Sequence, residues 1–266
     1  MNIITAHDLS SANMDLSVPT TLYAANGHSI FWLGNTDETA FRCNTYLIVD
    51  QHEAILVDPG SKQYFSQAKQ RVEQIMPPEE VSGMVLCHQD PDVAASMTDW
   101  LDVNPSMQVF TTPRTQVLLP HYGRSGYPYY DVTEKPVYAL PSGTRLKFVE
   151  APFLHFPGAF VTYDTQARYL FSGDIWAALD LDWTLTVNSF EEHIEKMNLF
   201  HLDYMASNLA ARGFIKRIEN YAIDAILPQH GSILGPQHVA AALDYLSNLR
   251  CGTDIIYADM ESNYGG

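Results

Sequence analysis

The sequence predicts an α/β protein in which two packed β-sheets are covered by helices on their outer faces. Short apolar runs are typical of buried strands, and longer amphipathic stretches are typical of helices packed on a sheet. Strands come first along the chain, strands and helices then mix, and helices dominate the C-terminal part. This order favours two packed sheets with helices outside them. With 266 residues and 46% apolar residues, one domain over residues 1–266 can bury a large core.

The strands and helices that we expect follow from these patterns. Predicted strands are Thr45–Val49, Ala54–Val57, Met84–Cys87, Gln108–Thr111, Leu146–Val149, Arg168–Phe171 and Ala225–Leu227. Predicted helices are Gln63–Met76, a segment from Pro91 to about Leu101, Phe190–Tyr221 and Pro236–Leu249. Within the third, we expect two helices that part near Arg212–Gly213.

The acidic composition argues against nucleic-acid binding. Asp and Glu total 31 against 15 Lys and Arg, which gives a formal net charge of −16. A nucleic-acid binder needs a basic face, so we expect no such partner. No run of about 18 apolar residues predicts a membrane span, and residues 1–10 lack the order of a secretory signal. Cys43, Cys87 and Cys251 are scattered and odd in number, which favours a cytoplasmic location.

The segment after the predicted strand Met84–Cys87 carries three side chains that can bind a metal. His88 and Asp90 are two residues apart, so a tight loop can turn both toward one point. Asp92 lies near the start of the next predicted helix, where the helix dipole tolerates a carboxylate. Taken alone, an aspartate at such a place is more often a turn former or a helix cap.

Three further candidates follow other predicted strands: His155 after Leu146–Val149, Asp174 after Arg168–Phe171, and His230 after Ala225–Leu227. Ligand sites in layered α/β folds gather at such strand ends. A single histidine near an apolar segment is more often a core residue, so the prediction depends on all six side chains together.

Together the six side chains would offer three imidazoles and three carboxylates. Such a set suits iron, manganese or zinc, and the lack of thiolate disfavours a structural zinc site of the cysteine type. Three carboxylates compensate much of the charge of two divalent ions, which one bridging carboxylate would hold roughly 3.5–4 Å apart. We expect Asp174 to be the bridge, because the other five side chains divide naturally between two metals.

These motifs resemble the metallo-β-lactamase-type domain of the flavodiiron proteins, which reduce dioxygen or nitric oxide. The first metal-binding block of that family reads His-x-Glu-x-Asp-His, and His88–Val93 (HQDPDV) is similar to it. A His, an Asp and a His then follow in the family at spacings close to those of His155, Asp174 and His230. Flanking segments also match the family: Asn44–Ile48, Leu140–Gly143, Ala151–Pro157, Phe171–Asp174 and Gln229–Gly231.

The resemblance covers residues 30–249 and implies the metallo-β-lactamase αββα sandwich, in which helices flank two mixed sheets. It also implies a division of ligands between two metals. The first metal would be held by His88, Asp90, His155 and Asp174. The second would be held by Asp92, Asp174 and His230.

The sequence departs from the family at two positions of the first block. Asp90 replaces the usual Glu and shortens one ligand arm by a methylene group. Val93 replaces the second His and cannot bind a metal, so the second metal would be one protein ligand short. Flavodiiron proteins also carry a flavodoxin-like FMN module. We expect none within this sequence, and therefore a likeness to stand-alone oxygen-binding di-iron proteins.

The resemblance implies a protein with two iron ions, or else manganese or zinc, and no FMN bound by this chain. It would bind, sense or reduce dioxygen, or nitric oxide, with a separate electron donor or signalling protein as partner, and a homodimer is a further expectation. The alternative is a binuclear hydrolase of an ester, thioester or phosphodiester. Hydrolytic relatives carry His-x-His-x-Asp-His, from which Asp90 and Val93 both depart. A non-catalytic scaffold is the third hypothesis.

Other residues have weaker signals. Cys87 is expected to be a core thiol that faces away from His88. The tyrosines of the aromatic segment at 121–130 would cover the metal pocket or pack on one another; they are Tyr122, Tyr127, Tyr129 and Tyr130. The remaining histidines match no motif and are expected to be surface or core residues: His7, His28, His52, His121, His193, His201 and His238.

Overall fold

A computed structural model describes residue 15, residues 17–34 and residues 39–258, and its larger sheet has seven strands in sequence order. They are β1 (Thr20–Ala25), β2 (His28–Trp32), β3 (Tyr46–Asp50), β4 (Glu53–Val57), β5 (Gly83–Val85), β6 (Gln108–Thr111) and β7 (Tyr129–Asp131). Neighbours from β1 to β4 are antiparallel, and neighbours from β4 to β7 are parallel. The change of direction at β4 makes this a mixed sheet.

The smaller sheet has five strands in the order β12-β11-β10-β9-β8. They are β8 (Val137–Ala139), β9 (Arg145–Glu150), β10 (Phe160–Asp164), β11 (Tyr169–Gly173) and β12 (Ala225–Pro228). Strands β8 to β11 pair antiparallel, whereas β11 and β12 are parallel. The parallel pair places the ends of β11 and β12 side by side.

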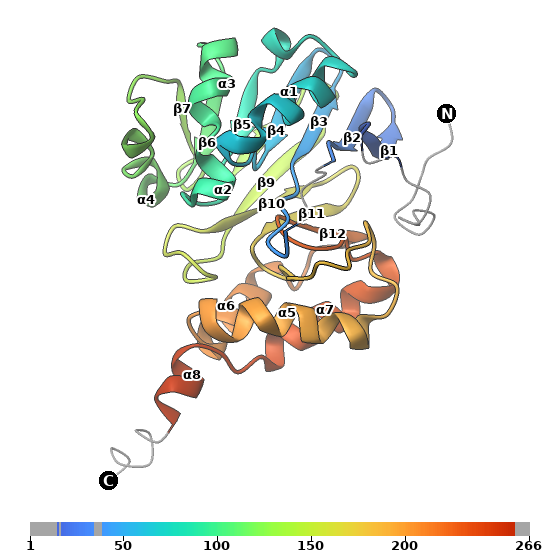
Figure 1. Cartoon of the computed structure of the whole chain (residues 1–266), viewed down its shortest axis with the longest axis vertical. Coiled ribbons are helices and arrows are strands. Elements are labelled where there is room, and N and C mark those ends of the chain that lie inside the picture. Colours follow the sequence, from blue (N-terminus) through green and yellow to red (C-terminus); the bar gives the residue numbers. More distant parts are fainter. Residues whose placement is uncertain (1–14, 16, 35–38, 259–266) are drawn as a thin grey trace.

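Helices cover the outer face of each sheet (Figure 1). The helices are α1 (Phe65–Glu73), α2 (Pro91–Ala94), α3 (Met97–Val103), α4 (Pro113–Gln116), α5 (Phe190–Tyr204), α6 (Asn208–Ile218), α7 (Pro236–Asn248) and α8 (Thr253–Ile256), with short 3-10 turns at Lys62–Tyr64, Pro78–Glu80 and Leu119–Tyr122. Helices α1 and α3 lie on the larger sheet, and α5, α6 and α7 lie on the smaller one. None of the helices in the described ranges is both long and apolar enough to cross a membrane.

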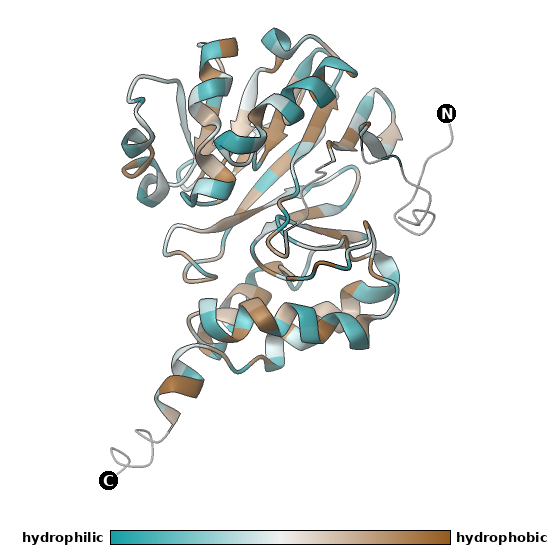
Figure 2. Cartoon of the chain, viewed as in Figure 1, coloured by the Kyte–Doolittle hydropathy of each residue, from teal (hydrophilic) through white to brown (hydrophobic). Residues whose placement is uncertain are grey.

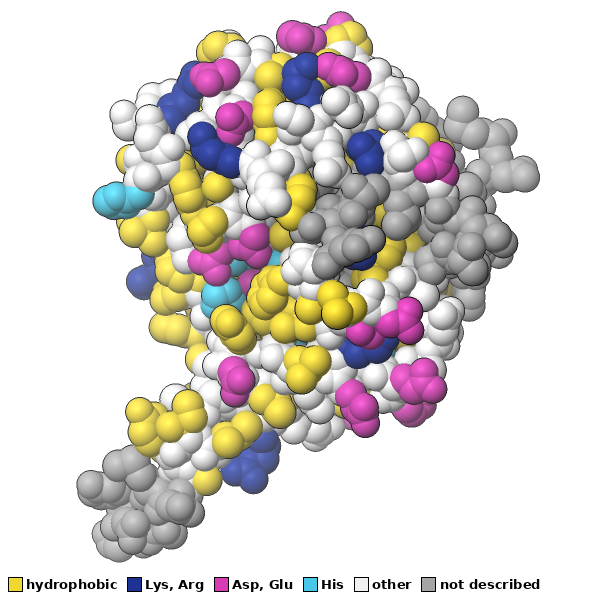
Figure 3. Space-filling model, viewed as in Figure 1, with side chains coloured by type: hydrophobic (Ala, Val, Ile, Leu, Met, Phe, Trp, Pro, Cys, Tyr) yellow, Lys and Arg dark blue, Asp and Glu magenta, His cyan; other side chains and the backbone are white. Residues whose placement is uncertain are grey.

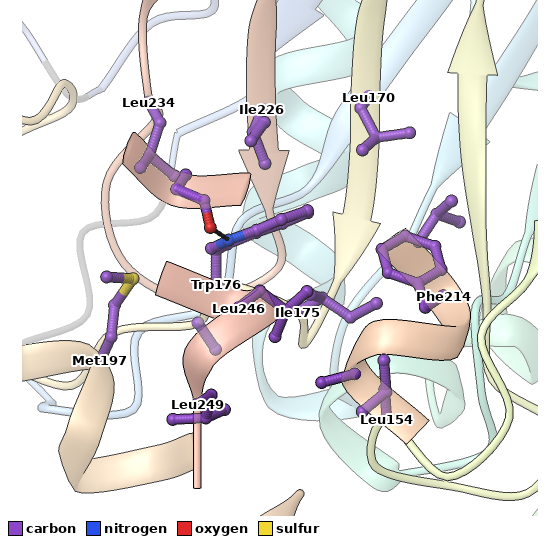
Figure 4. Close-up of a cluster of buried hydrophobic side chains, with 14 of the residues drawn as sticks. Leu154, Leu170, Ile175, Trp176, Met197, Phe214, Ile226, Leu234, Leu246 and Leu249 are labelled. Carbon is purple, nitrogen blue, oxygen red and sulfur yellow. Dashed lines mark hydrogen bonds between the residues drawn. The ribbon is translucent and has the colours of Figure 1, made fainter. Parts of the chain in front are cut away.

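Three apolar clusters hold these layers together, and Figure 2 shows hydrophobic residues along the strands and on helix faces. The central cluster lies between the sheets and includes Ile48 and Phe171. A second cluster packs α1 and α3 against the larger sheet. The third packs α5 to α7 against the smaller sheet around Trp176, whose Nε1–H donates to the Ala242 carbonyl (Figure 4). These four layers confirm the predicted αββα sandwich.

A fully buried histidine also connects the two sheets. His28 of β2 places Nδ1 2.8 Å from Asp50 Oδ2 and Nε2 2.8 Å from Asp164 Oδ2. Burial lowers the pKa of His28, but the contacts to Asp164 and Asp50 outweigh it, so the pKa is raised overall. We call His28, Asp50 and Asp164 the inter-sheet cluster.

The structure has five strands that the sequence analysis did not predict: β1, β2, β7, β8 and β10. Strands β1 and β2 form a hairpin through Asn26 and Gly27, both with positive φ, which is the two-residue turn that Asn-Gly favours. All five residues of β10 are buried, so it lacks the alternation of a half-exposed strand. Together with the seven predicted strands, these five strands make up the two sheets.

Two of the predicted helical segments each form two helices, and neither break lies where we expected one. The segment from Pro91 forms α2 and α3, which part at Ala95 and Ser96, where the Ser96 hydroxyl donates to the Pro59 carbonyl. The break near Arg212–Gly213 was wrong. Helix α6 begins after Ser207, whose hydroxyl accepts a hydrogen bond from the Ala210 N–H and caps the helix.

Candidate metal centre

The six predicted ligands come from four segments that follow strands. His88, Asp90 and Asp92 follow β5, and Pro91 at the first position of α2 starts the helix at once. His155 follows β9, Asp174 follows β11 directly, and His230 follows β12. Asp90 occupies the N-cap of α2, yet its side chain makes no capping hydrogen bond, so its carboxylate is free to face the site.

His88, Asp90, His155 and Asp174 form the first group, whose donor atoms all lie within 4.8 Å of one another. His88 Nε2 is 3.4 Å from Asp90 Oδ2 and 3.1 Å from Asp174 Oδ2. His155 Nε2 is 3.2 Å and 2.9 Å from the same two oxygens. Two imidazole nitrogens and two carboxylate oxygens therefore converge on one point.

Asp92, His230 and Cys43 form the second group, and their donor atoms also lie within 4.8 Å of one another. His230 Nε2 is 3.0 Å from Asp92 Oδ2. Cys43 was not among the predicted ligands, and it faces His230 across an isolated antiparallel bridge. The second group thus contains a thiol that sequence reasoning missed.

Asp174 lies between the two groups. Its Oδ2 faces the two histidines of the first group, whereas its Oδ1 lies 3.6 Å from His230 Nε2. The side chain is only 4% exposed, and Oδ1 makes no hydrogen bond within the described part of the chain. A buried carboxylate oxygen without a hydrogen bond is costly unless a cation faces it. The residues present therefore fit a pair of metal ions that share Asp174.

Outer contacts fix the orientation of the candidate ligands. His230 Nδ1 lies 3.2 Å from the Arg42 carbonyl and donates to it in the tautomer that leaves the Nε2 lone pair toward the site. His88 Nδ1 lies 3.1 Å from Cys87 Sγ. The Gln89 side-chain amide donates to Asp90 Oδ1 over 2.6 Å, which leaves Asp90 Oδ2 for the two histidines.

The electrostatics of the site suit a cation. Burial lowers the pKa of His230, but contacts to Asp92 and Cys43 outweigh it and raise the pKa to about 10. Burial also lowers the pKa of His155, but the contacts to Asp174 and Asp90 outweigh it and raise the pKa to about 9. Burial raises the pKa of Asp174, yet the nearby histidines hold it well below its ordinary value. Positive charge is thus stabilised at this point, as protons on histidine or as a metal.

Aromatic rings from α5 border the site. Ser189 caps α5 by accepting from the Glu192 N–H, and Phe200 and Tyr204 then fall one turn apart on the same face. Their rings stack at 4.6 Å, and each meets the His155 ring edge-on, at 5.8 and 5.9 Å. This aromatic wall comes from a helix, not from the tyrosine-rich segment that we considered.

The comparison with protein families is decisive. Residues 41–231 match the family model described as ODP family beta lactamase. The chain belongs to this family.

Two solved structures of chemotaxis sensor ODP are similar to this chain. A structure described as a peroxy diiron species is 32% identical with a TM-score of 0.81, and it covers 90% of this chain and 99% of that one. An apo structure from T. denticola is 33% identical with a TM-score of 0.78, over 90% and 98% of the two chains. These likenesses confirm the fold and the resemblance to flavodiiron-type domains.

Curated relatives are similar over part of their length. A nitric oxide reductase from Moorella thermoacetica is 29% identical over 202 residues, which are 71% of this chain and 49% of that protein. A diflavin flavoprotein from Synechocystis is 26% identical over 133 residues, which are 50% of this chain and 23% of that protein. The chain therefore spans half or less of the length of these relatives.

Two residues beside this ODP-family site escaped the sequence analysis. Asp58 follows β4 and is buried, and its Oδ1 accepts from the Cys87 N–H over 3.0 Å. Burial raises the pKa of Asp58 to about 6. The strand-end rule that selected Asp174 would have selected Asp58 as well. Cys43 precedes β3 instead of following a strand, so that rule could not find it.

Three expectations about neighbouring residues have mixed outcomes. Cys87 is a buried core thiol, as predicted, but its Sγ contacts the His88 ring, because β5 ends at Val85 and strand alternation does not reach Cys87. Tyr122 reaches the loop that carries His88 and Asp90, and its hydroxyl donates to the Gln89 carbonyl over 2.5 Å. Tyr130 packs on Phe110 instead.

The histidines outside the motif lie on both the surface and in the core. His28, His193 and His201 are buried, His52 and His121 are exposed, and His238 is partly buried. His7 lies outside the described residues. Val93 is fully buried in the apolar cluster under α1 and α3, which agrees with its lack of a metal-binding group.

Proposed function

We propose that this chain is a di-iron protein that binds dioxygen, in which His88, Asp90, Asp92, His155, Asp174 and His230 hold two iron ions. The observation that carries the proposal is the position of Asp174, with one oxygen toward each group. A carboxylate shared in this way is the usual bridge of a two-metal centre. When bound, the irons supply the redox chemistry and the binding of dioxygen.

The donor set supports iron over a hydrolytic metal pair. The second residue of the first block is Asp90, a hard oxygen donor, and Val93 provides no imidazole for an Asp–His pair that would handle metal-bound water. The names of similar structures also agree, because they describe a diiron chemotaxis sensor. Manganese and zinc are the alternative metals for this site.

The site is reachable by a small ligand. The side chains of Asp90 and Asp92 are each 32% exposed, and that of His155 is 18% exposed. Figure 3 shows histidine and acidic side chains together at the surface, bordered by hydrophobic side chains. A polar opening with an apolar border suits a small neutral molecule such as dioxygen or nitric oxide.

Electron counting separates sensing from reduction. Two ferrous ions that become ferric supply two electrons, whereas reduction of dioxygen to water takes four. Sustained reduction therefore needs a separate electron donor, because cofactors and not side chains carry such electrons. We propose that this chain alone takes up dioxygen once per iron pair, and that a separate donor or signalling protein is its partner.

The experiment measures metal content first and dioxygen uptake second. Protein purified without oxygen from iron-replete cells should contain about two irons per chain. When it is mixed with dioxygen and NADH, we expect one stoichiometric uptake with a change in visible absorption, and metal-free protein should show neither.

Two outcomes would contradict the proposal. Stoichiometric zinc without iron in such preparations would refute the di-iron assignment and favour a hydrolase, which ester and phosphodiester substrates would then reveal. Many turnovers of dioxygen without a partner would refute single uptake and identify the chain as a reductase.

A further inference from the structure

We propose that Cys43 binds the second metal as a thiolate and is its fourth protein donor, beside Asp92, His230 and the shared Asp174. This inference rests on the two-metal site proposed above. Compared with the flavodiiron pattern, the second metal would be one ligand short, because Val93 stands where that family has a histidine. Cys43 comes from a different part of the chain, and its Sγ lies within 4.8 Å of the donor atoms of Asp92 and His230.

The backbone holds Cys43 against His230 through several contacts. The two residues pair in an antiparallel bridge, and the Asn44 N–H donates to the Gln229 carbonyl over 2.6 Å. The Asn44 side-chain amide donates to the carbonyls of Pro228 and Gly231, on both sides of His230. These bonds hold the backbones of Cys43 and His230 side by side, so the proximity of the two residues is built into the fold.

Counting donors shows what Cys43 adds. The first group offers two imidazole nitrogens and two carboxylate oxygens, one of them from Asp174. Without Cys43, the second metal would have Asp92, His230 and Asp174 Oδ1 as its protein donors. With the thiolate, each metal would have four protein donors, with Asp174 counted for both.

The charge of the buried site also favours a thiolate. Asp90, Asp92 and Asp174 carry three negative charges, whereas two divalent ions carry four positive ones. Asp174, His230 and Cys43 are buried, and a fourth anionic donor there compensates charge on the side of the site that water screens least. A metal beside a thiol also displaces its proton, so metal binding itself supplies the anion.

The competing interpretation is that Cys43 is an ordinary buried thiol. It is 7% exposed, and its Sγ lies 3.8 Å from the Phe41 carbonyl, which is a weak contact. Cys87 and Cys251 are equally buried, and neither belongs to a group of metal-binding side chains in the described ranges. Substitutions of Cys87 and Cys251 can therefore serve as controls for substitution of Cys43.

Cobalt(II) is a suitable probe, because a thiolate bound to it gives an intense near-ultraviolet charge-transfer band. Metal-free, reduced protein is titrated with cobalt chloride without oxygen. We expect about two equivalents to bind, with the band accompanying one of them. In Cys43→Ser the band should disappear, and that equivalent should bind at least about 100-fold more weakly, since loss of even an outer contact costs about 10- to 100-fold.

The other equivalent should remain in Cys43→Ser, which also shows that the variant is folded. Cys251→Ser should keep both equivalents and the band. A second measurement needs no variant: X-ray absorption of the wild-type cobalt protein should show a sulfur neighbour at about 2.3 Å.

The outcomes separate this inference from the proposed function. Wild-type protein that binds two cobalt ions without the band or the sulfur neighbour would refute Cys43 ligation and leave the two-metal site intact. If the band were lost in Cys87→Ser but kept in Cys43→Ser, Cys87 would be the sulfur ligand and Cys43 ligation would be refuted. Wild-type protein that binds no cobalt would contradict the two-metal site itself.

Discussion

The inter-sheet cluster around His28 and the metal centre around Asp174 contain the same two residue types, but they use the histidine ring differently. Both ring nitrogens of His28 face carboxylates at 2.8 Å, and every side chain in that cluster is fully buried. At the metal centre, His230 uses Nδ1 for a backbone carbonyl and keeps Nε2 for the site. The residue types are therefore not what makes a metal site.

The two clusters differ in the solvent exposure of their carboxylates and in the contacts that the carboxylate oxygens make. The carboxylates of Asp90 and Asp92 are partly exposed, whereas Asp50 and Asp164 are sealed between the sheets. Asp174 Oδ1 makes no hydrogen bond within the described residues and lies 3.6 Å from His230 Nε2, whereas Asp50 and Asp164 each hold a ring nitrogen of His28 at 2.8 Å. Asp50 also accepts hydrogen bonds from the N–H and the hydroxyl of Ser142. The inter-sheet cluster should thus contribute to stability, and the metal centre should contribute to binding.

The largest expected effect is loss of both metals in Asp174→Ala. Because this carboxylate faces both groups, its removal should reduce the iron content from about two per chain to near zero. His230→Ala, which touches only the second group, should lose mainly one iron. Metal analysis after gel filtration checks both variants. Retention of two irons by Asp174→Ala would show that the carboxylate is not shared.

The next largest effect should follow from His28→Ala. Removal of the imidazole leaves Asp50 and Asp164 facing each other in a dry interior, and breaking such a buried pair costs about 3–5 kcal/mol. Urea unfolding of the metal-free protein measures this loss, while iron content should stay unchanged. The control is His52→Ala at an exposed turn, which should change stability by less than about 0.5 kcal/mol. Reduced iron content in His28→Ala would contradict the separation of the two clusters.

A smaller effect concerns His201, a buried histidine whose two ring nitrogens both bond to backbone groups. Its Nε2 accepts from the Trp176 N–H, and its Nδ1 donates to the Met197 carbonyl, so the folded protein needs the neutral ring. Burial lowers its pKa to about 4, whereas the unfolded chain protonates near 6.5. Its contribution to stability should therefore be present above pH 6.5 and be lost as the pH falls toward about 4, by at most about 3 kcal/mol.

The measurement compares urea unfolding of metal-free wild type and His201→Gln at neutral pH and near pH 4. The variant should lose less stability than wild type over this interval. His28 should behave oppositely, because its raised pKa means that its contribution is lost as the pH rises through that value. An equal loss in wild type and His201→Gln would show that His201 does not titrate in this range.

The sequence predicted the layers of the fold better than its strands. Runs such as Ala54–Val57 are continuous and apolar, so their burial follows from composition. Strand β10 contains Thr162 and Asp164 and is still wholly buried. Asp164 contacts His28 and accepts hydrogen bonds from the N–H groups of Gln166 and Ala167. The dipeptide Asn26-Gly27, which favours a two-residue hairpin turn, was a usable signal for the hairpin of β1 and β2.

At the site, what lies close along the chain was predictable and what lies close only in space was not. His88 and Asp90 share one loop, so their convergence could be inferred from spacing. Cys43 lies 187 positions before His230 in the chain and meets it at a bridge that no local pattern encodes. The contact depends on Asn44, whose side chain ties two distant segments together.

Gly173 restricts which substitutions the protein can accept during evolution. Its φ is +56°, and a Cβ at this position would lie 2.9 Å from Cys87 Sγ. A smaller residue at position 87 would relieve the crowding but not the backbone strain, so a single compensating substitution is insufficient. Drift at this position is therefore restricted twice over, and we expect Gly173 and Asp174 to be inherited together wherever descendants retain the centre.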